Sequence, residues 1–141
     1  MPGPDPTHWL HRYTPREWVR AAMGELVQAR AAYARRNGRA GLAGCRRAAG
    51  VALNGILAAE LDFDPGWGRT YMDHLAHLAA DLERPEAVRE AAKRLLETPL
   101  PGGEIVALRT AKSDEAALDA AEVIMAHAYA AVLRAESAAE T

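Results

Sequence analysis

Cysteine and aromatic residues are scarce in this chain. Its 141 residues include a single cysteine, Cys45, and a single phenylalanine, and Phe, Trp and Tyr together make up 6% of the sequence. One cysteine excludes a disulfide within the chain. Because Cys45 lies in a stretch that we expect to be a buried helix, we interpret it as a small core hydrophobe rather than a reactive thiol.

The sequence has neither an excess of charge nor a long apolar run. The formal net charge is −2 and the pI is about 6.2, so bulk charge does not indicate nucleic-acid binding, although a local basic patch remains possible. No run of about eighteen apolar residues predicts a membrane span. The N-terminal MPGPDPTHW lacks the basic and apolar segments of a secretory signal. We therefore expect a soluble cytoplasmic protein.

The sequence also lacks the familiar motifs of cofactor binding and nucleophilic catalysis. It contains no glycine-rich phosphate loop, no dinucleotide fingerprint and no Ser/His/Asp arrangement. Gly41 and Gly44 fall inside an expected helix, not between a strand and a helix. We expect no bound cofactor.

Helix-forming residues dominate what is present. Half of the residues are hydrophobic, much of that half is alanine, and alanine, leucine, arginine and glutamate all favour helix. The length suits one domain. We predict an all-α fold, a single up-and-down bundle of about five helices over residues 14–136. An irregular lead-in at 1–13 precedes it, and a frayed end at 137–141 follows it.

Capping signals predict where the helices begin and end. Thr14-Pro15-Arg16-Glu17 fits a capping box with proline at the first helical position, and Asn37-Gly38 predicts a left-handed stop. Thr70 and Ser113 predict the starts of a short third helix and of the last helix, and Pro85 predicts the start of a fourth. Helical spacing predicts these core positions: Trp18, Ala22, Leu26, Ala29 and Tyr33; Tyr71, Leu75, Leu78 and Leu82; Val88, Ala91, Ala92, Leu95 and Leu96; Leu118, Ala121, Met125, Tyr129 and Val132.

The stretch at 38–61, GRAGLAGCRRAAGVALNGILAAEL, is the most informative of the expected helices. One side of it is bulky and the other nearly bare, and the bare side carries Gly41, Gly44, Ala48, Gly55 and Ala59. We expect this helix to be central, with the small residues allowing close approach of an internal neighbour or of a symmetric partner. Arg46 and Glu60 fall within the bulky side. We expect their stems to cover the core while their charges reach water. The alternatives are a buried polar contact or an anion site formed by Arg39, Arg46 and Arg47.

The layout resembles the HEPN-like superfamily of small helical bundles. Residues 18–33 look like the usual first helix, and 43–54, AGCRRAAGVALN, look like the second, with its basic start. Tyr71-Met72-Asp73-His74-Leu75 and the run at 120–124 fit the later elements. The resemblance covers about residues 15–135 and rests on diffuse patterns of small and apolar residues. It implies a five-helix bundle, often dimeric, that serves either as a ribonuclease of toxin–antitoxin systems or as a non-catalytic binding module.

The ribonuclease members carry an arginine and a histidine four to six residues apart near the last helices. This chain has that spacing at Arg69 and His74, but it lies after the second helix, and no histidine follows Arg109 at that distance. We therefore do not transfer the activity. In the nuclease alternative, Arg69 would contact phosphate and His74 would transfer a proton.

Two further groups are candidates for binding. Asp73, His74 and His77 could share one helix face and hold a metal ion, although we favour a solvated polar face as their explanation. Trp67, Arg69 and Tyr71 could stack on a base or dock a partner, or Trp67 could fold back over the end of the bundle. We interpret His8, His11 and His127 as surface residues.

These observations favour a non-catalytic HEPN-like interaction module, acting as a homodimer and with a possible protein partner. The alternatives are an RNA-directed nuclease or toxin–antitoxin component, and a metal-binding helical bundle.

Overall fold

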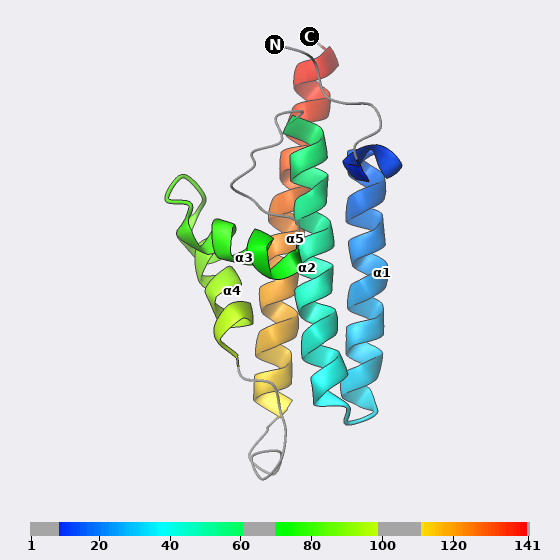
Figure 1. The fold of residues 1–141 in the computed structure, drawn as a ribbon, viewed down its shortest axis with the longest axis vertical. Helices are drawn as coiled ribbons and strands as arrows, with labels where there is room; N and C mark the ends of the chain where they lie inside the picture. The colour runs from blue at the N-terminus through cyan, green and yellow to red at the C-terminus, as the bar shows by residue number, and fades with distance from the viewer. Residues whose placement is uncertain (1–8, 61–69, 99–110, 141) are drawn as a thin grey trace.

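The protein is an all-α helical bundle, as the sequence predicts. The structure is a computed structural model and describes residues 9–60, 70–98 and 111–140. Its elements are a short 3-10 helix (Trp9–Arg12), α1 (Pro15–Ala34), α2 (Gly38–Glu60), α3 (Tyr71–Ala80), α4 (Glu86–Glu97) and α5 (Ala111–Glu140). No strand occurs in these ranges. The three long helices α1, α2 and α5 lie side by side, and α3 and α4 pack on the side away from α1 (Figure 1).

The capping box at the start of α1 is confirmed. The Thr14 hydroxyl accepts a hydrogen bond from the Glu17 amide at 3.2 Å, and the Glu17 carboxylate accepts one from the Thr14 amide at 2.9 Å. These bonds hold the pKa of Glu17 below its ordinary value. Thr70 caps α3 in the same way, through Asp73.

The turn between α1 and α2 differs in detail from the expectation. The residue in the left-handed conformation is Arg36, with φ 61°, rather than Asn37 or Gly38. Asn37 instead begins the next helix, because its side-chain oxygen accepts a hydrogen bond from the Ala40 amide at 3.1 Å. The last helix also differs at both ends: it begins at Ala111, before Ser113, and continues to Glu140.

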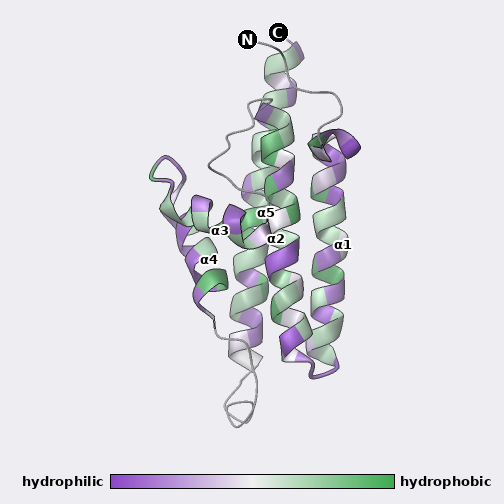
Figure 2. Ribbon diagram, in the orientation of Figure 1, coloured by the Kyte–Doolittle hydropathy of each residue, from purple (hydrophilic) through white to green (hydrophobic). Residues whose placement is uncertain are grey.

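Helix α2 is the centre of the bundle. Every residue from Ala48 to Ala58 is buried, including the polar Asn54, and α2 contacts all four other α-helices. Figure 2 shows hydrophilic residues gathered at the α1–α2 turn and along the α3–α4 connection. A helix segment that is buried all round is typical of the middle of a bundle. This confirms the central position expected for the second helix.

The small-residue side of α2 faces α1. A Cβ atom added at Gly41 would lie 2.6 Å from the Tyr33 ring, and one added at Gly44 would lie 2.9 Å from the Ala29 Cβ. At Gly55 it would meet the Pro15 carbonyl oxygen at 3.1 Å. The close neighbour of this stripe is therefore an internal helix, and the stripe is not free to receive a symmetric partner.

Three of the expected core positions are wrong. Tyr129 is 45% exposed and Leu82 is 82% exposed. Leu82 lies beyond the end of α3 at Ala80, so the helical spacing that placed it in the core no longer applies. Tyr71, in the first turn of α3, rests partly on Gly50 and is otherwise exposed.

One helix in the described ranges is long and apolar enough to cross a membrane. It spans Ser113–Glu140, and 44% of its most apolar 18-residue stretch is buried inside the bundle. The core helix of a soluble protein meets the same criterion, so one such helix is weak evidence for a membrane span.

Crowding between α1 and α2 is testable with matched glycine substitutions. Gly44 lies against the Ala29 backbone, whereas a Cβ added at Gly24 in α1 would meet nothing within 4 Å. Both Gly→Ala changes gain the same helix propensity, so the difference between their free energies of unfolding measures the crowding at Gly44. We expect Gly44→Ala to unfold with a free energy about 1–3 kcal/mol lower than that of Gly24→Ala, as measured by urea denaturation. Equal stabilities would contradict the close approach.

Candidate functional site

The structure describes only part of the expected aromatic binding loop. Trp67 and Arg69 lie outside the described residues, so neither the stacking site nor the Arg69–His74 pair can be located as a whole. Of these residues, Tyr71 and His74 are described, both in α3.

His74 is a core residue rather than part of a solvated polar face. Its side chain is 1% exposed, and Leu75 and Leu78 beside it on α3 are also buried. Asp73 is exposed and caps the helix through Thr70. Within the described part of the chain, no three His, Cys, Asp or Glu side chains lie close enough to hold a metal ion. The structure therefore does not bring Asp73, His74 and His77 together.

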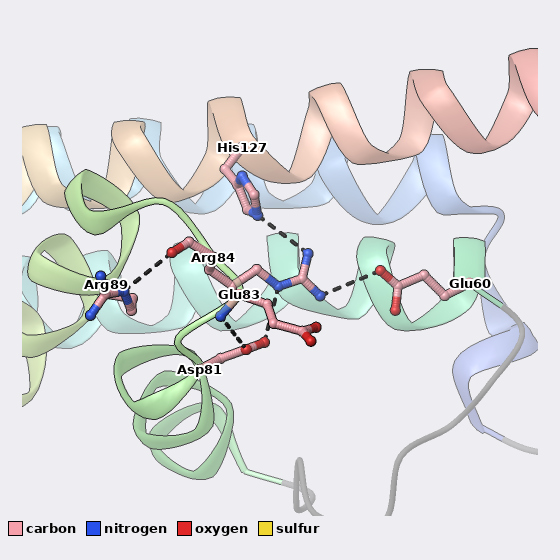
Figure 3. A network of polar contacts seen from close by, with 6 residues as sticks. All are labelled: Glu60, Asp81, Glu83, Arg84, Arg89 and His127. Carbon is pink, nitrogen blue, oxygen red and sulfur yellow. Dashed lines mark hydrogen bonds and ion pairs between the residues drawn. The ribbon is translucent and has the colours of Figure 1, made fainter.

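The polar cluster that the structure does assemble centres on Arg84, in the α3–α4 connection (Figure 3). Its Nη2 donates to Glu60 of α2 at 3.4 Å, and its Nε donates to Asp81 at 3.3 Å. Its Nη1 lies 3.5 Å from Nε2 of His127 on α5. Arg89 of α4 donates to the Arg84 carbonyl oxygen at 3.2 Å. The cluster thus ties the connection to three helices.

The charges within this cluster balance. The Arg84 side chain is only 18% exposed and lies between two carboxylates, so little of its charge is available to an outside anion. Burial, followed by the charges of Arg84 and Arg134, holds the pKa of His127 below its ordinary value. A neutral imidazole can accept a hydrogen bond from the guanidinium at Nε2. This arrangement is suited to holding helices together.

Sequence patterns missed this cluster because its members are far apart in the chain. Arg84 and His127 are separated by 43 positions, and His127 was expected at the surface, whereas it is half-buried. The one available signal was Glu60, a charge on the bulky side of a core helix. The Glu60 side chain is 44% exposed, so its charge reaches water as expected, and it also pairs with Arg84.

Arg46 makes a part-buried polar contact, which is closer to the less favoured expectation. Its Nε donates to the Leu95 carbonyl oxygen at 2.8 Å, and its Nη2 donates to the Thr98 carbonyl oxygen at 2.9 Å. These carbonyls end α4, where no intrahelical donor remains for them. Arg47 instead pairs with Glu25 on the surface. The three arginines Arg39, Arg46 and Arg47 therefore do not form a shared anion site.

Cys45 is fully buried, as expected for a small core hydrophobe. Burial raises the pKa of its thiol to about 11. The reactive form, the thiolate, is therefore scarce at neutral pH.

The outer face of α1 and α5 carries an open apolar groove of about 460 Å³. The groove is lined by Arg16, Val19, Arg20, Met23, Met125, Ala126 and Tyr129. Exposed Val27 lies one helical turn from Met23 on α1. Three large exposed hydrophobic side chains, two of them lining one groove, are more than the scattered apolar residues that any soluble surface shows. We name Met23, Val27 and Tyr129 the α1/α5 patch.

Comparison with protein-family models, with curated proteins and with solved structures gives no match.

The role of Arg46 at the end of α4 is testable by truncation. Arg46→Ala leaves part-buried carbonyl oxygens without their charged donor, which is expected to lower the free energy of unfolding by about 1–3 kcal/mol. Arg47→Ala removes only an exposed ion pair and is expected to cost less than about 1 kcal/mol. Denaturant unfolding of the two variants checks the difference. Equal losses of unfolding free energy in the two variants would mean that the bonds from Arg46 to the end of α4 add no more stability than an exposed ion pair.

The lowered pKa of His127 predicts a pH dependence of stability. The unfolded chain binds the proton more readily, with a pKa near 6.5, so stability is lost as the pH falls below that value. In thermal melts between about pH 8 and about pH 5.5, we expect a smaller drop in Tm for His127→Gln than for the natural sequence. His11→Gln, at an exposed site, serves as the control. An unchanged drop in His127→Gln would show that this imidazole is not linked to folding.

Proposed function

We propose that this chain is a non-catalytic interaction module of the HEPN-like kind, working in the cytoplasm as a homodimer. The observation that carries the proposal is the α1/α5 patch, in which Met23 is 56% exposed and Val27 is 62% exposed. Exposed apolar patches on a folded domain are typical of surfaces that bind another protein.

The polar groups of the described residues support a structural role more than catalysis. Arg84 is held between two carboxylates, and Arg46 is bonded to the end of α4. Cys45 and His74 are buried in the core. A catalytic base or nucleophile must reach its substrate, so these residues are poor candidates for either role.

The rival functions have less support from the described residues. The nuclease alternative needs His74 at an RNA phosphate, and a side chain that is 1% exposed does not reach one in this structure. The metal-binding alternative needs ligands from Asp73, His74 and His77, which do not converge. A protein partner other than a second copy remains compatible with the same exposed patch.

Sedimentation of the purified full chain tests this proposal. We expect a dimer at micromolar concentration, since an apolar patch on both copies is covered only by association. A monomer at all accessible concentrations would refute the homodimer. Incubation with single-stranded RNA is expected to release no fragments, and cleavage that His74→Ala abolishes would favour the nuclease instead.

A further inference from the structure

We infer that the homodimer forms through the outer face of α1 and α5, with its two-fold axis parallel to the helices. In this arrangement, α1 of one copy lies against α5 of the other, and four helices surround the axis. The inference rests on the proposed function, because it names the surface that the interaction module uses.

Two ion pairs border the apolar centre of this face. Arg16 holds Glu136 through two bonds of 2.7 and 2.8 Å, and Arg30 pairs with Glu122. On each helix the two charged residues are fourteen positions apart, which is about 21 Å along a helix. The residues halfway between them are Met23 on α1 and Tyr129 on α5, the two large exposed hydrophobic side chains that line the groove.

The charges on this face are arranged in two edges of opposite sign. Both arginines of the ion pairs belong to α1, and both glutamates belong to α5. Each of the four side chains is about half exposed, so each retains capacity for a second partner. The bond to Arg16 also holds the pKa of Glu136 below its ordinary value, which keeps the acidic edge charged.

This charge pattern decides between the two possible axes. With the axis parallel to the helices, Arg16 of one copy faces Glu136 of the other, and Arg30 faces the other Glu122. With the axis across the helices, Arg16 would face Arg30, and Glu122 would face Glu136. Like charges facing each other are unfavourable in an interface. Only the parallel axis makes the face complementary to itself, as a two-fold interface requires.

A second copy suits this face better than a lipid surface does. Helix α5 is apolar enough to enter a membrane, and just 44% of its apolar window is buried in the bundle. However, the patch is bordered at both ends by arginine–glutamate pairs. A flat hydrocarbon layer would desolvate those charges without offering partners, whereas a second copy supplies opposite charges at both ends.

Charge-reversal variants test the surface. The variant Arg16→Glu/Arg30→Glu makes the face wholly acidic, and Glu122→Arg/Glu136→Arg makes it wholly basic. Each variant alone is expected to dimerise at least about tenfold more weakly than the natural chain, and an equal mixture is expected to form a heterodimer. Surface ion pairs contribute little to folding, and circular dichroism checks that both variants fold. Leu82→Glu, at the exposed α3–α4 connection, is expected to leave the dimer unchanged.

Disulfide trapping tests the axis. Met23→Cys and Tyr129→Cys chains are mixed and oxidised, and a mixed cross-linked dimer is expected because these positions face each other across the parallel axis. Met23→Cys alone is expected to cross-link poorly. Efficient cross-linking of Met23→Cys with itself would instead indicate the crosswise axis and overturn the assignment. Cys45 is buried, so it does not compete.

The outcomes separate this inference from the proposed function. A dimer that tolerates both charge reversals, with no cross-link from the mixture, refutes the α1/α5 interface but leaves the homodimer standing. A natural chain that stays monomeric refutes both. Binding of the natural chain to neutral phospholipid vesicles, lost in Met23→Glu but not in Leu82→Glu, would show that the patch serves a membrane and would overturn the inference.

Discussion

The close approach of α1 to α2 is the constraint on which the rest of the structure depends. Gly44 lies so near Ala29 that a single added carbon would be 2.9 Å away, and Gly41 lies under the Tyr33 ring. Where backbones approach this closely, side-chain volume between them is minimal. Larger core residues also come from the helices that pack on α2 elsewhere, among them Leu75 of α3, Leu95 of α4 and Ile124 of α5.

The polar contacts follow from this arrangement. Charges on a central helix are best accommodated where partners from the neighbouring helices are within reach. Arg46 donates to the carbonyl oxygens that end α4, and Glu60 pairs with Arg84. Both contacts fasten the α3–α4 unit to α2, and the half-buried His127 fastens it to α5. The charges thus set how the smaller helices dock on the larger ones.

The same arrangement leaves one face uncovered. Helices α3 and α4 occupy the side of the bundle away from α1 (Figure 1), so nothing within the described chain covers the outer face of α1 and α5. That face combines an apolar centre with charges of opposite sign on its two edges. Its chemistry is that of an interface, which is why we assign it to a second copy of the chain.

By itself, the sequence determined the helical class, the capping box at Thr14, the helix start at Thr70, the buried role of Cys45 and the central position of α2. Each of these depends on local propensity or on periodicity within one helix. Only the tertiary structure decided that the small stripe faces α1, that His74 is buried, that Tyr129 is exposed and that Arg84 meets His127. These depend on which helices become neighbours, and contacts between residues many positions apart leave no periodic signal in a single sequence.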